Sequence, residues 1–229
     1  MSIHLQRAIT SLKKQLLTLG AHVEENVHLA VKAVESRDTA SAEQVIQQDD
    51  IIDQMEVDIE EDGLKMLALY QPVAIDLRFI IVTIKINNDL ERIGDLAVNV
   101  AERAMFLANW RPLPIYFKFH AMGEITQSML KRSLDSLVNT DVELARQVCA
   151  DDDKVDAMNR EVYQQVEIGT RDHPDDLEAF LHALGVSRHL ERIADLATNI
   201  SEDVIYMASG EIVRHRVEDY TSGSKGEPD

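Results

Sequence analysis

The sequence predicts an all-α protein made of two tandem antiparallel three-helix bundles that are related by internal pseudo-symmetry. Apolar residues recur at intervals of three or four along six long segments, which is the period of an amphipathic helix. Only 5% of the residues are aromatic, and the 229 residues include 9 glycines and 5 prolines, which argues against sandwiches and barrels. A motif of the first half also recurs in the second half, so the helices divide into two equivalent sets.

Short breaks separate the predicted helices. The first helix ends before residues 36–40, a polar segment typical of a turn with a capping residue. Pro72 separates the second helix from the third, because the residue before a proline is biased away from helix. Two prolines in 109–114 end the third helix, residues 139–141 form the next turn and cap, and Asp175 is the expected cap of the sixth helix. The predicted helices cover about residues 3–35, 40–69, 73–108, 115–138, 141–168 and 176–209.

The lengths of these segments predict how the chain divides into domains. Helices of roughly 25–35 residues span about 40–50 Å, and three of them with short connections form an antiparallel bundle. We therefore predict one three-helix repeat over residues 1–110 and a second over 111–216, with the boundary in the proline-rich segment. Residues 217–229 are polar and contain Ser, Gly and Pro, so we expect a disordered tail there.

Charge and cysteine content exclude several classes of protein. Asp and Glu number 41 against 23 Lys and Arg, giving a formal net charge of -18. Nucleic-acid binding is not expected, because neutralising phosphates requires clustered basic side chains. The single cysteine, Cys149, excludes an internal disulfide and a multi-thiolate zinc site. The amino terminus does not resemble a secretory signal and no stretch approaches the roughly 18 apolar residues of a membrane span, so we expect a soluble cytoplasmic protein.

The two halves of the chain share a repeat. The nine residues LERIGDLAV, starting at Leu90, match LERIADLAT, starting at Leu190, which is 100 positions later. A weaker match joins DDIIDQM, starting at Asp49, to DDKVDAM, starting at Asp152, which is 103 positions later. Because the two matches occur in the same order in both halves, they indicate a duplicated three-helix unit.

Acidic residues within these repeats share helix faces. Glu91 and Asp95 are four positions apart, so they lie on one face, and Glu191 and Asp195 do the same in the second half. If the second and third helices turn near Gln71, positions whose numbers sum to about 144 face each other. This rule and the two offsets place Asp53 opposite Glu91, Asp49 opposite Asp95, Asp156 opposite Glu191 and Asp152 opposite Asp195.

Such crowded carboxylates predict a metal site in each bundle. Like charges at short range repel, and either protonation or a bound cation relieves the repulsion. Oxygen-rich sites suit hard and borderline cations. The sequence therefore predicts divalent or ferric metal ions as cofactors, with Fe, Zn, Mg, Mn and Ca all open.

Two other interpretations remain open. Acidic residues four apart often form only a solvated helix face, which would leave a metal-free interaction scaffold. Alternatively, clustered Glu and Asp on antiparallel helices suit a carboxylate-bridged di-iron oxidase. Such sites need two Glu-x-x-His motifs, and this sequence has one, at Glu25 and His28. The sequence contains no nucleophile elbow, Walker loop or HExxH motif, so we do not expect an enzyme.

The segment QPVAIDLR over residues 71–78, followed by Lys85 and then DLERIGD starting at Asp89, resembles the PhoU family. The second motif and the segment 207–215 resemble it too, so the resemblance extends to His215. It implies two tandem three-helix bundles with pseudo-twofold symmetry. It also implies that the acidic motif of each third helix, with acids of the second helix, forms a site for a multinuclear metal cluster. In the second copy His173-Pro174 and Glu178 replace the Gln-Pro and the Arg of the first.

The same resemblance implies a regulator. PhoU-like proteins are expected to restrain phosphate uptake and phosphate-starvation signalling. The implied partners are the ATPase subunit of the phosphate ABC transporter, the phosphate sensor histidine kinase and a second copy of the chain in a homodimer. Contact with a membrane would be indirect, through those partners.

Overall fold

The computed structural model describes residues 3–210, and these residues contain six long α-helices and no strand. The helices are α1 (Ile3–Ser36), α2 (Thr39–Tyr70), α3 (Ala74–Asn109), α4 (Phe119–Asn139), α5 (Val142–Asp172) and α6 (Leu177–Ser209). A short 3-10 helix, η1 (Pro174–Asp176), connects α5 to α6. The all-α prediction is therefore confirmed.

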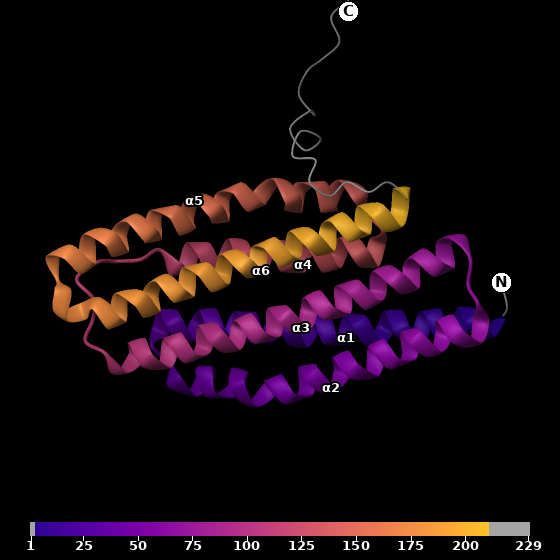
Figure 1. The fold of residues 1–229 in the computed structure, drawn as a ribbon, viewed down its shortest axis with the longest axis horizontal. Coiled ribbons are helices and arrows are strands. Elements are labelled where there is room, and N and C mark those ends of the chain that lie inside the picture. Colours follow the sequence, from indigo (N-terminus) through magenta and orange to yellow (C-terminus); the bar gives the residue numbers. More distant parts are fainter. Residues whose placement is uncertain (1–2, 211–229) are drawn as a thin grey trace, which may run out of the picture.

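The helices form two antiparallel three-helix bundles that lie side by side (Figure 1). Helices α1, α2 and α3 pack together, and so do α4, α5 and α6. The bundles meet where α3 packs against α6 and α1 packs against α4. Helices α2 and α5 contact only helices of their own bundle, and they lie on opposite outer sides of the molecule (Figure 1). The predicted tandem bundles are confirmed.

The two central helices bury equivalent residues of the repeat. Leu90 and Ile93 on α3 are fully buried, as are Leu190 and Ile193 on α6. Helical spacing places these side chains on one stripe, which faces the core of its own bundle. The acidic residues next to the stripe are left at its edge, where they are half-buried or exposed.

Side-chain caps fix the starts of two helices, as predicted. Asp38 precedes α2, and its Oδ1 accepts hydrogen bonds from the backbone N–H groups of Ala40 at 3.1 Å and Ser41 at 3.3 Å. Asp141 precedes α5 and accepts one from the N–H of Leu144 at 3.0 Å. These bonds satisfy donors that the first turn of a helix leaves free.

The start of α4 corrects the sequence analysis. The helix begins at Phe119, not near residue 115. The apolar residues before it are part of the core without being helical: Phe117 is 8% exposed, and its ring lies 5.3 Å from that of Phe119. Two prolines, Pro112 and Pro114, hold this segment outside the helix, so apolar spacing was a poor guide there.

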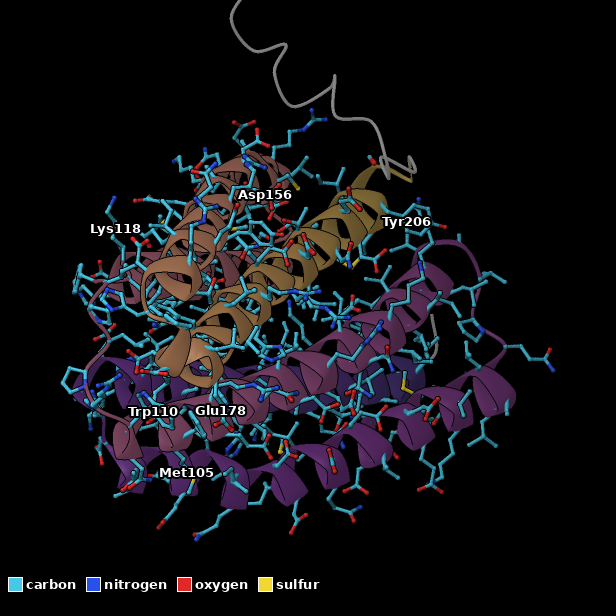
Figure 2. All side chains as sticks on the ribbon, turned by 60° about the vertical axis from the view of Figure 1, so that its left-hand side comes forward. Met105, Trp110, Lys118, Asp156, Glu178 and Tyr206 are labelled. Carbon is cyan, nitrogen blue, oxygen red and sulfur yellow. The ribbon has the colours of Figure 1, made fainter. Side chains whose placement is uncertain are left out.

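The start of α6 is a second correction. Asp175 lies inside η1, and the N-cap position belongs to Asp176, whose side chain makes no capping hydrogen bond. The buried carboxylate of Asp176 instead accepts hydrogen bonds from Trp110 Nε1 at 3.0 Å and Arg111 Nε at 2.8 Å. Figure 2 shows Trp110 beside the first turn of α6, which carries Glu178. The end of α3 is thus tied to the start of α6.

The predicted domain boundaries, at residues 1–110 and 111–216, stay a prediction. The predicted tail, 217–229, lies outside the described residues. None of the described helices combines the length and the apolar character needed to cross a membrane.

Candidate functional site

The first acidic cluster lies between α2 and α3. Asp49 and Asp53 come from α2, and Glu91 and Asp95 come from α3. The two helices approach closely at Gly94, where an added Cβ would lie 3.2 Å from Ile52 Cγ2 and 3.8 Å from Asp49 Oδ1. This approach brings together the carboxylates that the hairpin geometry predicted to face each other.

Burial and mutual repulsion disfavour the charged forms of this first cluster. The pKa of Asp49 is raised to about 6, mainly because burial removes water, and further by the charges of Asp53, Asp95 and Asp50. Asp49 Oδ1 is buried and accepts no hydrogen bond within residues 3–210. The pKa of Glu91 is also raised, first by desolvation and then by Asp95 and Asp53. A bound cation would relieve both costs.

The second acidic cluster repeats this arrangement between α5 and α6. Asp152 and Asp156 come from α5, and Glu191 and Asp195 come from α6. The pKa of Asp152 is raised to about 7, first by desolvation and then by Asp195 and Asp156. Desolvation followed by the charge of Asp156 raises the pKa of Asp195 as well. Arg160 Nη1 lies 3.5 Å from Asp156 Oδ2, so this cluster already has one cationic neighbour.

The carboxylates do not form a ready-made coordination shell. Within residues 3–210, no three His, Cys, Asp or Glu side chains converge closely enough to hold a metal ion. The chemistry of the donors fits a hard cation, but binding would require these side chains to turn inward from the positions seen here. The role of the eight predicted residues as metal ligands stays a prediction.

Glu56 is a cluster member that the sequence analysis missed. Its pKa is raised by desolvation and by the charges of Glu60 and Asp53, and its own charge acts on Glu91. Asn87 Nδ2 donates hydrogen bonds to the Glu56 backbone carbonyl at 2.9 Å and to its Oε1 at 3.3 Å. Glu56 lies three residues after Asp53, so the same helix face extended by one turn would have found it.

The Glu-x-x-His pair of α1 lies apart from both acidic clusters. His28 Nδ1 is 3.1 Å from Gln127 Oε1 of α4, at the contact between the bundles. Glu25 and His28 line a groove with Gln127 and Lys131, and no acidic residue of α2, α3, α5 or α6 lines it.

Comparisons with known proteins agree with this architecture. The family model described as the PhoU domain matches residues 16–104 and again residues 119–204. A protein of Aquifex aeolicus named phosphate-specific transport system accessory protein PhoU homolog is 40% identical over 204 residues, covering 89% of this chain and 92% of the relative. A PhoU homolog 1 of Thermotoga maritima is 32% identical and covers 98% of this chain and 97% of its own.

Solved structures match the fold over nearly the same extent. The crystal structure of PhoU from Pseudomonas aeruginosa superposes with a TM-score of 0.88 at 36% identity, covering 90% of this chain and 99% of that one. The crystal structure of the phosphate transport system regulatory protein PhoU from Streptococcus pneumoniae superposes with a TM-score of 0.82 at 29% identity. The match covers 91% of this chain and 99% of that one. With two matched domains, one in each bundle, this chain belongs to the PhoU family.

Proposed function

We propose that this chain is a cytoplasmic accessory regulator that restrains phosphate uptake and phosphate-starvation signalling, and that each of its acidic clusters binds cations. Its relatives are named accessory proteins of the phosphate-specific transport system, which supports a role in regulating phosphate transport. The observation that carries the cation proposal is the duplicated cluster, where Asp49 and Asp152 have pKa values raised to about 6 and about 7. No catalytic residue is needed for this function.

The proposed partners are the ATPase subunit of the phosphate transporter, the sensor histidine kinase and a second copy of this chain. The long helices leave large apolar side chains exposed at the α2–α3 turn, including Leu69, Val73 and Ile75. Exposed apolar side chains close together are typical of an interaction surface. This turn is therefore the place where we expect a partner to bind.

Affinity capture from cells tests the regulatory part of the proposal. The tagged chain is recovered from cells grown in high and in low phosphate, and the co-purifying proteins are identified. We expect the transporter ATPase subunit and the histidine kinase, in amounts that depend on phosphate. A variant with Val73→Ser and Ile75→Ser should lose them, while Leu177→Ser, which changes an exposed apolar residue at the turn between α5 and α6, serves as the control. Recovery of neither protein in either condition would contradict the proposal.

Metal analysis tests the cation part. Protein purified without chelator is dialysed against Mn²⁺ or Fe²⁺, and bound metal is counted per chain. The pair Glu91→Gln with Asp95→Asn should remove the metal of the first bundle only, and Glu191→Gln with Asp195→Asn that of the second. The matched control, Glu43→Gln with Glu143→Gln, removes the same charge from exposed positions outside the clusters. Metal content that is the same in all three variants as in the unaltered chain would reject these sites.

A further inference from the structure

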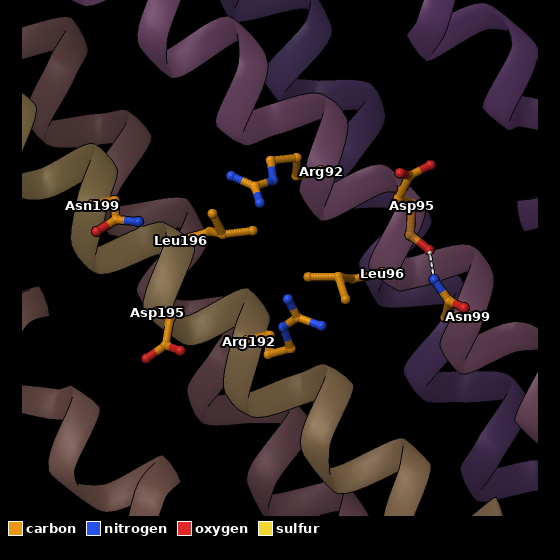
Figure 3. A pocket seen from close by; sticks show the side chains of 8 residues that line it. All are labelled: Arg92, Asp95, Leu96, Asn99, Arg192, Asp195, Leu196 and Asn199. Carbon is orange, nitrogen blue, oxygen red and sulfur yellow. Dashed lines mark hydrogen bonds between the residues drawn. The ribbon is translucent and has the colours of Figure 1, made fainter.

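A pocket lies on the pseudo-symmetry axis of the molecule, between α3 and α6. Its volume is about 380 Å³, and each helix contributes four residues at positions that are 100 apart in the sequence. Two arginines of the repeated motif, Arg92 and Arg192, extend into the gap between the helices from opposite sides (Figure 3). The pocket is therefore built once per chain, with one half from each bundle.

Neither arginine is held by a short contact within residues 3–210, although Arg192 is near enough to Glu191 and Asp195 to act on their pKa values. Neither guanidinium makes an ion pair or a hydrogen bond there, although Asp and Glu number 41 in the sequence. Some other arginines are paired, namely Arg111 with Asp176, Arg132 with Asp151, and Arg171 with Glu167, whereas Arg78, Arg146 and Arg188 also make no ion pair within residues 3–210. What distinguishes Arg92 and Arg192 is that both line the same pocket.

Two leucines, two aspartates and two asparagines complete the lining of the pocket. Leu96 and Leu196, each 8% exposed, extend into the gap and line it between the two arginines (Figure 3). Asp95 and Asp195 also border the pocket, but their carboxylates point away from the gap, each to its own side (Figure 3).

We propose that this pocket binds one small tetrahedral oxyanion of the phosphate type, held between Arg92 and Arg192. A guanidinium presents planar, paired N–H donors that match two oxygens of such an anion. A tetrahedral anion offers two pairs of oxygens, so it meets two arginines related by a twofold axis equally well. The pocket also has room for the anion with some of its water. The inference does not rest on the proposed regulatory function, and it requires only the two arginines and the contact between α3 and α6.

The acidic clusters on both sides predict how cations affect this binding. Their negative charge opposes an anion in the gap, and Asp195 is close enough to Arg192 for that guanidinium to lower its pKa in opposition to burial. Cations in the clusters would remove this opposition. We therefore expect the anion to bind more tightly when Mg²⁺ is present than when a chelator is present.

Equilibrium dialysis of the full chain against labelled inorganic phosphate, with Mg²⁺ and with chelator, tests the proposal. We expect saturation at one phosphate per chain. Arg92→Gln and Arg192→Gln should each weaken binding by about tenfold or more, because each removes charge-assisted hydrogen bonds. Arg92→Lys should bind with intermediate affinity, since it keeps the charge but loses the paired donors.

Arg171→Gln is the matched control, because Arg171 is an exposed arginine on α5 outside the pocket. It changes the net charge by the same amount and should leave the affinity within about twofold. Circular dichroism melts of all variants exclude unfolding as the cause of any loss. No saturable binding in either buffer, two phosphates per chain, or an equal loss in the control would each overturn the proposal. Failure of the partner capture would leave this result unaffected.

Discussion

Asp152 and Asp49 are equivalent residues whose ionisation opposes the folded state. Their pKa values are raised from 3.8 to about 7 and about 6, chiefly because each is withdrawn from water and secondarily because other carboxylates surround it. A carboxyl whose pKa is higher in the folded state holds its proton more tightly there. Stability then falls as the pH rises from the unfolded pKa to the folded pKa, and stays low above it.

This relation predicts that Asp152→Asn stabilises the cation-free protein at pH 8. The amide resembles the protonated carboxyl, so the gain should be about 1–2 kcal/mol at pH 8 after allowance for partial solvent exposure, and smaller at pH 4.5. Urea denaturation at both pH values measures it. Glu143→Gln, at an exposed position of α5 outside the cluster, should change little with pH. A gain for Asp152→Asn that does not increase from pH 4.5 to pH 8 would contradict the crowding described here.

At the scale of the helix, glycines set how closely neighbouring helices approach. An added Cβ at Gly123 of α4 would lie 2.5 Å from Val31 Cγ1 of α1, and one at Gly20 of α1 would lie 2.9 Å from Leu134 Cδ1 of α4. Both contacts belong to the surface where the bundles meet. The Val31 side chain is β-branched and has little rotational freedom in a helix, so it moves aside less easily than the end of the Leu134 side chain does.

Gly123→Ala should therefore destabilise the protein by about 1–3 kcal/mol through overpacking, in spite of the better helix propensity of alanine. Urea denaturation measures the change. Gly185→Ala is the control, because its new methyl group would meet the flexible side chain of Arg103 and not a packed valine. We expect that variant to be neutral or slightly stabilised. If both substitutions lower stability equally, the α1–α4 contact is not limited by Gly123.

For the whole molecule, the contact between α3 and α6 is symmetric in position but not in chemistry. Lys85 Nζ of α3 lies 3.4 Å from Asp203 Oδ1 of α6, and the Asp203 side chain is 2% exposed. At the equivalent positions Gly185 lies under Arg103, so no ion pair forms between those two residues. Within residues 3–210, the α3–α6 contact thus has this ion pair at one end and no equivalent pair at the other.

Lys85→Met should weaken this joint by about 1–2 kcal/mol, because it removes a cation beside a buried carboxylate. Thermal melts monitored by circular dichroism measure the loss. Lys65→Met is the control: Lys65 pairs with the exposed Glu61 and Asp62, so its loss should lower the melting temperature less than that of Lys85. Adding Asp203→Asn to Lys85→Met should recover part of the loss. Equal effects of the two lysine substitutions would show that the inter-bundle pair contributes little.

The sequence by itself determined the helices, their grouping in two bundles and the four acidic pairs that face each other. Local physics is sufficient for these features, since apolar spacing selects helices, Asp38 and Asp141 cap them, and the length of a hairpin fixes which positions are opposite. Prediction from apolar spacing failed between residues 110 and 119, where apolar residues contribute to the core from a segment that is not helical.

Only the tertiary structure decided how the two bundles meet. Spacing along one chain says nothing about which face of α3 contacts α6, because that choice depends on side chains that are 100 positions apart. The contact aligns Arg92 with Arg192 around one pocket and directs Asp95 and Asp195 away from it. It also determines how far each carboxyl is buried, and therefore which pKa values rise, since desolvation is a property of the packed molecule.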